Sequence, residues 1–345
     1  MTFKKIAAMT DIHFGRKSDS EQHNQDCLDY VSWFCSNVRE RKPDQIIVMG
    51  DWFDNRSRLR LDTQWRSREA FDMLNGLNLP IWFLIGNHDM YFRNNRSVHS
   101  HPYLDLFPGV RVINEPTLIG DILLCPYLVG EEFAVVPSYE CKYVFGHFEF
   151  PMFLTNEWYE FEDKGHGITA DMFTHPEWVF SGHFHKRQIK KNSHGVNICY
   201  IGNTFGMDYN DTNDRKRGAM FFEHGGVPEF LDWTAGPNYN RIKMSEVLEM
   251  DIEGFEKKFN SKSVIECTDD VNIPDEDLFV LNEYIQGMVR EFTVKPVQKE
   301  VAENTSDQEL GQNLDEFVVN SIRALDVTGT RIDPVKLETL YMGAR

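Results

Sequence analysis

Residues 45–54 read QIIVMGDWFD, an apolar run that ends at a glycine and is followed at once by a segment with two carboxylates. Short apolar runs that close on a polar turn are typical of strands buried on both faces of a sheet. Comparable runs recur at 6–9, 81–85, 143–145, 178–180, 198–201 and 219–222. Apolar residues at helical spacing predict helices over 24–41 and 63–74, each between two of these strands. This alternation indicates an α/β fold on a mixed or parallel sheet, with an antiparallel part near 110–127.

Composition divides the 345 residues into four parts. Residues 1–236 carry the strand pattern, and we expect a small α+β domain over 237–298. Residues 299–313 contain no aromatic residue and few apolar ones, which is typical of a linker. Residues 314–345 are expected to form two short helices, too small to build a core of their own.

The second and fourth parts of the chain carry more specific predictions. In the small domain we expect a strand at 263–267, a helix near 278–289 and a strand over 291–297. The second of the two final helices is expected to begin at Asp333, an N-cap residue followed by proline. The first presents one apolar face, formed by Leu314, Phe317, Val318, Ile322 and Leu325.

The formal net charge of −18 by itself argues against nucleic-acid binding through overall electrostatic attraction. Residues 237–345 hold 12 Lys and Arg against 22 Asp and Glu, so the acidity is concentrated at the carboxyl end. No apolar run approaches the roughly 18 residues of a membrane span, and no secretory signal is apparent. The six cysteines contain no CxxC pair. We therefore expect a cytoplasmic protein with reduced thiols.

Polar groups directly follow five of the predicted strands. In chain order they are Asp11-Ile12-His13, Gly50-Asp51-Trp52-Phe53-Asp54, Gly86-Asn87-His88-Asp89, Gly146-His147 and Gly182-His183-Phe184-His185. Loops at the carboxyl ends of strands in one sheet meet at a common rim. Asp, Asn and His supply ligands suited to Mn, Fe or Zn, and the absence of cysteine argues against a closed structural zinc. The sequence therefore predicts a metal site at this rim.

The five motifs DxH, GDxxD, GNHD, GH and GHxH, in this order, resemble those of the calcineurin-like metallophosphoesterase superfamily. Within it the chain is most similar to SbcD-type DNA repair nucleases, and among these to the recombination endonuclease subunits of T-even bacteriophages. The resemblance implies an αββα sandwich of two mixed sheets flanked by helices, a small α+β capping domain and a helical segment that docks on a partner. It also implies a phage origin, and so the host cytoplasm.

The resemblance also implies a role for each motif residue. Two divalent metal ions, Mn²⁺ with Mg²⁺ as the alternative, would be shared by Asp51. Asp11, His13 and His185 would hold one ion, and Asn87, His147 and His183 the other. His88 would stabilise the transition state or protonate the departing oxygen, with its ring oriented by Asp54 or, alternatively, by Asp89. We expect the other histidines to lie at the surface or in the core, with His99 and His101 as the first exceptions.

Twelve of the 36 Lys and Arg follow these motifs or a later loop. A basic rim suits the phosphates of a polyanion, although the same residues are also read as ordinary solvated loop charges. The set is Arg56, Arg58, Arg60, Arg93, Arg96, Lys186, Arg187, Lys190, Lys191, Arg215, Lys216 and Arg217. The candidate DNA contacts among them are Arg56, Arg58, Arg93, Arg96, Lys186 and Arg187.

The function implied is a two-metal DNA nuclease of recombination and double-strand break repair. It would act as an exonuclease on duplex ends and an endonuclease on single strands, with an SMC-like (SbcC/Rad-type) ATPase, as a homodimer within a heterotetramer. Two alternatives remain open from the residues alone. One is a metallophosphatase or small phosphodiesterase for a phosphoprotein or nucleotide, and the other is a non-catalytic scaffold, which the complete set of ligands disfavours.

Overall fold

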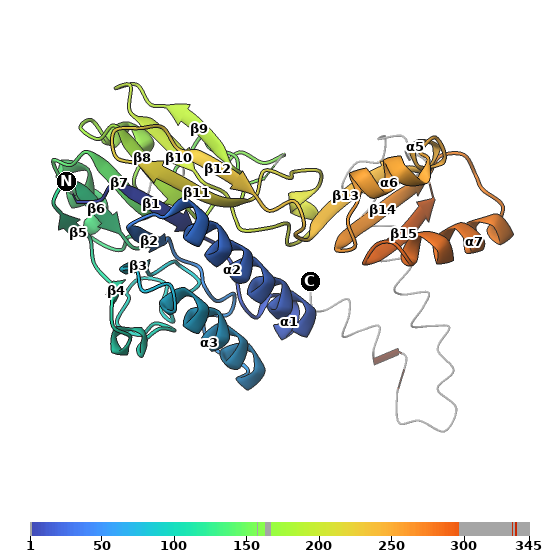
Figure 1. Cartoon of the computed structure of the whole chain (residues 1–345), viewed down its shortest axis with the longest axis horizontal. Coiled ribbons are helices and arrows are strands. Elements are labelled where there is room, and N and C mark those ends of the chain that lie inside the picture. The colour runs from blue at the N-terminus through green and yellow to red at the C-terminus, as the bar shows by residue number, and fades with distance from the viewer. Residues whose placement is uncertain (1, 157, 163–166, 297–332, 334, 337–345) are drawn as a thin grey trace. The chain divides into compact units, whose positions relative to one another are not determined.

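A computed structural model of the chain describes residues 2–156, 158–162, 167–296, 333, 335 and 336. Two six-stranded mixed sheets pack face to face, and helices lie on the outer side of the first (Figure 1). The first sheet has the order β12-β11-β1-β2-β3-β4. Its strands are β1 (Lys5–Met9), β2 (Gln45–Val48), β3 (Ile81–Leu84), β4 (Val110–Ile113), β11 (Gly218–Glu223) and β12 (Glu229–Asp232).

The second sheet has the order β5-β6-β7-β8-β10-β9. Its strands are β5 (Thr117–Ile119), β6 (Ile122–Cys125), β7 (Tyr143–His147), β8 (Trp178–Gly182), β9 (Gln188–Lys191) and β10 (Asn197–Tyr200). In the first sheet, β1, β2, β3 and β4 run parallel to one another, and β11 and β12 are added through antiparallel pairings. In the second sheet, β6, β7, β8 and β10 run parallel, and β5 and β9 are the antiparallel edge strands. The expected αββα sandwich of two mixed sheets is therefore confirmed.

Successive residues of a strand enter different cores, because side chains alternate between the two faces of a sheet. In β1, Ile6 and Ala8 pack between the sheets, where they join Phe145 of the second sheet. Ala7 and Met9 pack on the other face, under the helices α2 (Glu21–Arg41) and α3 (Leu61–Asn75). Such burial on both faces is why these strands read as continuous apolar runs.

The predicted helices and strands of the two sheets are confirmed, with shifts at their ends. Helix α2 begins three residues before the predicted 24–41, because the Ser20 hydroxyl accepts a hydrogen bond from the His23 amide and caps it. The sequence did not predict β9 or β12, which lie at sheet edges and carry polar side chains. The remaining short elements are α1 (Arg16–Asp19), α4 (Glu132–Val135), η1 (Leu104–Leu106), η2 (Val136–Ser138), η3 (Ala170–Met172) and η4 (Tyr209–Asp211).

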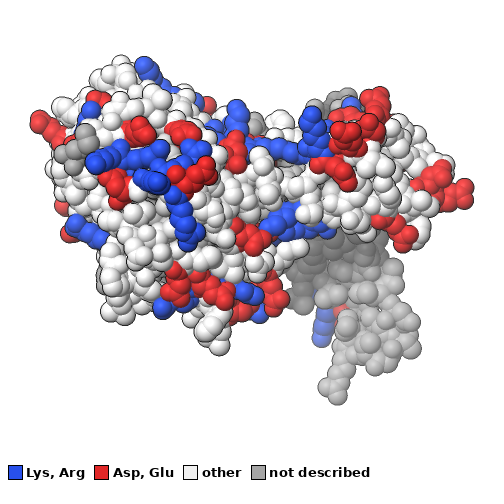
Figure 2. Space-filling model, in the orientation of Figure 1, with Lys and Arg blue, Asp and Glu red and all other residues white. Residues whose placement is uncertain are grey.

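A third, parallel sheet follows, with the order β13-β14-β15. It consists of β13 (Asn238–Lys243), β14 (Ser263–Asp269) and β15 (Glu291–Pro296), with helices α5 (Met244–Leu248), α6 (Ile252–Lys258) and α7 (Asp275–Gln286). Its apolar core is separate from those of the two large sheets. The expected strands and the expected helix of this region are confirmed, and β13 is an addition whose polar sequence hid it. Acidic side chains gather over these helices in Figure 2.

The three sheets belong to one compact unit that ends at Pro296. The division into domains of 1–236 and 237–298 therefore remains a proposal, and the linker at 299–313 lies outside the described residues. At the far end, the Asp333 carboxylate accepts from the amides of Val335 and Lys336, as an N-cap does. The five apolar residues proposed for partner docking, Leu314, Phe317, Val318, Ile322 and Leu325, also lie outside the described residues.

All six cysteines are free thiols, five of them buried. In the described part of the chain, no helix has both the length and the apolarity needed to cross a bilayer.

A buried carboxylate joins the third sheet to the first. Asp26 on α2 is only 3% exposed and forms two bonds with the Arg290 guanidinium, at 2.6 and 2.9 Å. Lys262 lies 3.1 Å from the same carboxylate. Two cations from the third-sheet region therefore share one acidic side chain of α2, and Lys262 also contacts the Asp29 carboxylate at 2.5 Å.

We expect Asp26→Ala to lower the free energy of unfolding by about 3 kcal/mol, because it leaves two partly buried cations without their shared partner. Urea denaturation followed by circular dichroism measures the change. The matched control is Asp72→Asn on α3, which removes an exposed pair with Arg68 and is expected to cost less than about 1 kcal/mol. Equal losses in the two variants would contradict the proposed weight of the buried contact.

Candidate metal centre

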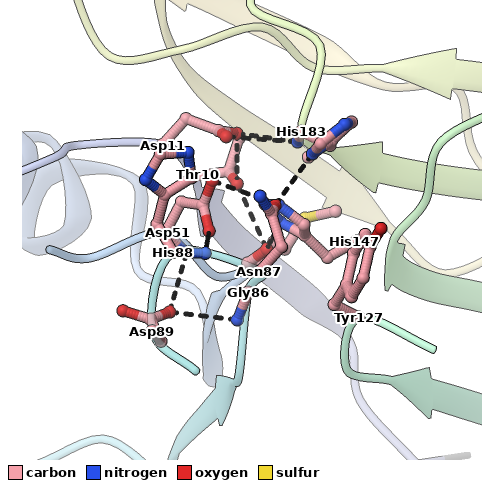
Figure 3. A network of polar contacts seen from close by, with 12 residues as sticks. Thr10, Asp11, Asp51, Gly86, Asn87, His88, Asp89, Tyr127, His147 and His183 are labelled. Carbon is pink, nitrogen blue, oxygen red and sulfur yellow. Dashed lines mark hydrogen bonds and ion pairs between the residues drawn. The ribbon is translucent and has the colours of Figure 1, made fainter. Parts of the chain in front are cut away.

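The carboxyl ends of five parallel strands bring the predicted ligands together, although the strands come from two different sheets (Figure 3). The first sheet supplies four of the residues and the second supplies three. After β1 come Asp11 and His13, after β2 Asp51 and after β3 Asn87, while β7 ends at His147 and β8 leads into His183 and His185.

The seven side chains form two groups around Asp51. Asp11, His13 and His185 have ligand atoms within 4.8 Å of one another, and so do Asp51, His147 and His183. The Asp51 carboxylate oxygen Oδ2 lies 3.8 Å from His13 Nε2 and 3.4 Å from His147 Nε2, so it faces both groups. This is the placement expected of a carboxylate shared by two cations.

Asn87 completes the second group. Its side-chain oxygen lies 3.0 Å from His147 Nε2 and 2.9 Å from His183 Nδ1. In the first group, the Nε2 atoms of His13 and His185 point at each other across 3.3 Å. Oxygen and imidazole nitrogen atoms that converge in this way fit divalent metals with borderline or hard character. The residues present therefore fit two ions, one on each side of Asp51.

Several of these side chains depend on an unusual backbone. Asp11, His13, Asp51 and His183 have φ values of 52°, 54°, 54° and 82°, in the left-handed region that non-glycine residues seldom occupy. Each such residue costs on the order of 1 kcal/mol or more, and clusters of them are typical of functional sites. The strain turns each side chain back toward the centre immediately after its strand ends.

Glycines before the ligands allow this crowding. A Cβ atom on Gly86 would lie 2.2 Å from the Asp51 carboxylate, and one on Gly182 would lie 2.2 Å from the Thr10 hydroxyl oxygen. At Gly50, whose φ is 97°, a Cβ would lie 2.8 Å from His147 Nδ1. Glycine is therefore required at these positions for steric reasons, because any side chain would displace a candidate ligand or its neighbour.

Polar contacts on the far side accompany three of the imidazole rings, and one of these contacts is a hydrogen bond. His147 Nδ1 lies 2.8 Å from the backbone carbonyl oxygen of Met49, so this nitrogen donates its proton and Nε2 faces the centre. His13 Nδ1 lies 3.4 Å from the Asp54 carboxylate, and His183 Nε2 lies 3.5 Å from the Glu149 carboxylate. Such partners orient histidine ligands and raise their basicity.

Buried charges shift the protonation of the centre. Burial alone would lower the pKa of His147, but the nearby Asp51 carboxylate outweighs it and raises this pKa to about 9. Burial would also raise the pKa of Asp51, yet the surrounding histidines, His147 first, hold it well below its usual value. Burial lowers the pKa values of His13 and His185. Without metal, Asp51 and His147 therefore form an ion pair, and His13 and His185 are neutral.

His88 lies at the rim of the centre and is half-buried, unlike most of the ligands. Its amide donates to the Asp51 carboxylate at 2.8 Å, and its ring lies 5.0 Å from the ring of His13. The structure corrects the expected partner of this ring. Nδ1 of His88 donates to the backbone carbonyl of Asp54 at 2.6 Å, whereas the Asp54 carboxylate contacts Arg16 at 3.1 Å. Asp54 therefore orients His88 through its main chain.

The alternative partner, Asp89, has a different role. Its buried carboxylate accepts from the amides of Asp51 and Gly86 at 2.9 and 3.0 Å, and also from those of Trp52 and Phe53. His101 Nε2 lies 3.0 Å from the same carboxylate. Asp89 thus ties the loop after β2 to the loop after β3, and His101 is the buried histidine that supports it. His101 is therefore a core histidine, and the exception expected of it is wrong.

Sequence reasoning missed two residues beside the centre. Arg16 pairs with the carboxylates of Asp54 and Asp208, at 3.1 and 2.6 Å. Tyr127 follows β6, and its ring lies beside His147 (Figure 3) while its hydroxyl donates to Glu149 at 3.2 Å. Neither belongs to a recognisable motif. Only the position of Arg16, three residues after His13, gave a signal in the sequence.

Of the six candidate DNA contacts, four have side chains that are at least partly exposed and two are bound to internal partners. Arg58 and Arg93 are exposed, and Arg56 and Lys186 are half-buried. The predicted DNA contact at Arg96 is wrong. This side chain is only 6% exposed and donates to the backbone carbonyls of Asn114 and Tyr127 at 2.7 and 2.5 Å.

The predicted DNA contact at Arg187 is wrong for the same reason. It donates to the Asp232 carboxylate at 2.6 Å and to the Ile201 carbonyl at 3.1 Å. Side chains already committed to internal partners are not available to a phosphate, so Arg96 and Arg187 stabilise the fold instead.

Residues 4–187 match the model of the calcineurin-like phosphoesterase family. The chain belongs to this family. Calcineurin-like phosphoesterases use a dinuclear metal site, which agrees with the two ligand groups around Asp51. The protein is therefore a metal-dependent phosphoesterase.

A relative of this phosphoesterase is exonuclease subunit 1 of Enterobacteria phage T4, which is 26% identical over 239 residues, 66% of this chain and 67% of the relative. Similar solved structures include a dimetal phosphatase from Danio rerio, with 10% identity, 64% of this chain and 92% of that chain covered, and a TM-score of 0.41. They also include the nuclease MPE from Pseudomonas putida, with 16% identity, 63% and 84% coverage, and a TM-score of 0.31.

Metal binding by this phosphoesterase is expected to release a proton at neutral pH. Because the pKa of His147 is raised to about 9, the metal-free protein holds a proton there at pH 7, and a metal must displace it. Affinity for Mn²⁺ should therefore rise about tenfold per pH unit between pH 7 and 8. Titration calorimetry in buffers of different ionisation enthalpy measures the proton count.

The control is His194→Gln, which changes an exposed histidine and should leave the proton count unchanged. His147→Gln should remove the released proton. An affinity independent of pH in the unaltered protein would show that His147 is not protonated before metal binds.

Proposed function

We propose that this phosphoesterase is a DNA nuclease that uses two metal ions, Mn²⁺ in the first instance, to hydrolyse phosphodiesters. The observation that carries the proposal is the position of the Asp51 carboxylate between two groups of candidate ligands, with His88 beside it at the rim. The T4 relative, whose name is exonuclease subunit 1, supports a nuclease among the activities open to the family. The proposed substrates are duplex ends for exonuclease action and single strands for endonuclease action.

The geometry supports the proposed catalytic roles. Asp11, His13 and His185 would hold one ion and Asn87, His147 and His183 the other, with Asp51 shared. When bound, such a pair supplies a hydroxide nucleophile at neutral pH and neutralises the charge that develops on the phosphate. His88 is held with Nδ1 on the Asp54 carbonyl, so its Nε2 is the atom that would face the substrate. A proton on that nitrogen would stabilise the transition state or protonate the leaving oxygen.

The arrangement of charges supports a polyanionic substrate at this rim. Exposed Arg58 and Arg93, with half-buried Arg56, lie on the loops that follow β2 and β3, the same loops that carry Asp51 and His88. They are the proposed phosphate contacts, together with Lys186. Since the chain as a whole carries a net charge of −18, these few cations would give weak DNA binding alone. A partner protein is therefore part of the proposal.

The proposed partner is an SMC-like (SbcC/Rad-type) ATPase, in a heterotetramer built on a homodimer of this chain, and the proposed setting is recombination and double-strand break repair. The T4 relative is named as a subunit, which supports an assembly. Residues 314–345, which lie outside the described part apart from 333, 335 and 336, are the proposed docking segment. Their apolar stripe is too small for a core of its own and suits a helical partner.

We expect His88→Ala to retain both metal ions and to lose at least about 100-fold in phosphodiester cleavage, the usual contribution of a positioned acid. End-labelled duplex and single-stranded DNA in Mn²⁺ measure cleavage, and metal analysis measures occupancy. Asp51→Ala is the matched comparison, because it should lose metal as well as activity. Full activity in either variant would contradict the assignment. Turnover of p-nitrophenyl phosphate without any cleavage of DNA would favour a phosphatase instead.

Deletion of residues 310–345 is expected to abolish co-purification with the ATPase while leaving metal binding and the far-ultraviolet circular dichroism of the remaining chain intact. The physical reason is that the apolar stripe at 314–325 has no core of its own to fold into. A complex that survives the deletion would refute the docking role of this segment.

A further inference from the structure

A pocket of about 570 Å³ opens beside His147, on the side of the metal centre formed by the second sheet. Its walls are largely aromatic and aliphatic, with Tyr127, Leu128, Phe133, Phe148 and Ile168 among them. Among the described residues, its polar lining includes His147, Glu149 and the hydroxyl of Tyr127. Pockets of this size with a few convergent polar groups are typical of small-molecule sites. None of the motifs explains why such a pocket should lie against a candidate metal ligand.

Hydrogen bonds fix the pocket to the metal centre. The Tyr127 amide donates to the Ile85 carbonyl at the end of β3, at 2.8 Å, and the Tyr127 carbonyl accepts from buried Arg96 at 2.5 Å. These bonds tie a loop of the second sheet to the strand end that carries Asn87 and His88. The Tyr127 ring therefore has a set position next to His147, as Figure 3 shows.

The described lining is unfavourable for the phosphate backbone. No lysine or arginine occurs among the described residues that line the pocket, and the Glu149 carboxylate would repel a phosphate. The same carboxylate already accepts from the Tyr127 hydroxyl at 3.2 Å and suits a neutral group that donates N–H bonds. The cations exposed on Arg58 and Arg93 belong instead to loops of the first sheet. The pocket is thus largely apolar and aromatic, whereas Arg58 and Arg93 are exposed on loops outside it.

We propose that this pocket receives a nucleobase of the strand being cut, adjacent to the scissile phosphate. The half-buried rings of Tyr127 and Phe133 provide the stacking walls, and Glu149 accepts from the amino or imino groups of the base. The inference rests on the proposed nuclease function and adds to it a reason why single strands are substrates. A base can enter such a pocket only when it is unpaired and turned out of the stack.

Phe133 is the residue for the test, because it lines the pocket and packs against an apolar cluster that contains none of the candidate metal ligands. The substrate is end-labelled single-stranded DNA with one abasic residue, and its cleavage under single-hit conditions is compared with that of unmodified DNA. In the unaltered protein, one of the two linkages that flank the abasic residue should be cut about tenfold more slowly, the effect of one lost stacking contact. Phe133→Ala should slow cleavage of unmodified DNA by a similar factor.

The decisive result is that the effects of the abasic residue and of Phe133→Ala on the cleavage rate do not add. Phe133→Ala should cut the affected linkage beside the abasic residue as fast as the unaltered protein does, because neither combination has a base stacked on Phe133. Phe133→Tyr should restore the preference for the intact base. Tyr139→Ala is the matched control, since Tyr139 packs partly buried against the same apolar cluster as Phe133 but does not line the pocket.

Two failures can be told apart. If the abasic residue and Phe133→Ala slow cleavage independently, or if neither affects it while DNA is still cut, the nucleobase pocket is wrong and the nuclease function stands. If no DNA is cut in Mn²⁺ by the unaltered protein, the proposed function fails, and the pocket inference falls with it.

Discussion

The carboxylate of Asp89 holds the loop after β2 against the loop after β3, and the metal centre depends on this brace. It accepts from backbone amides of both loops, including those of Asp51 and Gly86, and it is buried with His101 behind it. A carboxylate that accepts several amide protons in a buried position is a strong and directional contact. Because the brace fixes the main chain around Asp51, it favours the position of the Asp51 carboxylate between the two groups of candidate ligands.

The centre concentrates groups that repel or strain one another. Imidazole nitrogens face each other across 3.3 Å, and four ligand residues have positive φ values. The surrounding fold offsets these costs. The first-sheet strands that carry four of the candidate ligands are buried on both faces, between the second sheet on one side and α2 and α3 on the other. Rigid strands that end at one rim allow a strained loop to persist where an isolated loop would relax.

The two sheets give the two sides of the centre different chemistry. Loops of the first sheet carry exposed arginines next to His88, whereas loops of the second carry Tyr127, Phe133 and Glu149 around a pocket beside His147. A substrate that spans both sides would place charge on the first and an uncharged ring on the second. A nucleotide within a single strand has this division between its phosphate and its base, which links the proposed function to the further inference.

The sequence by itself determined the order of the five motifs along the chain. It also determined the family and, through the resemblance to that family, the set of seven candidate ligands, because glycine, aspartate and histidine at strand ends are local features. It could not decide which partner each side chain takes. Only the tertiary structure shows that Asp54 orients His88 through its carbonyl, and that Asp89 braces two loops. The same holds for Arg96 and Arg187, which are bound internally, and for the pocket beside His147. These features depend on contacts between segments far apart in the chain, which no local pattern of residues records.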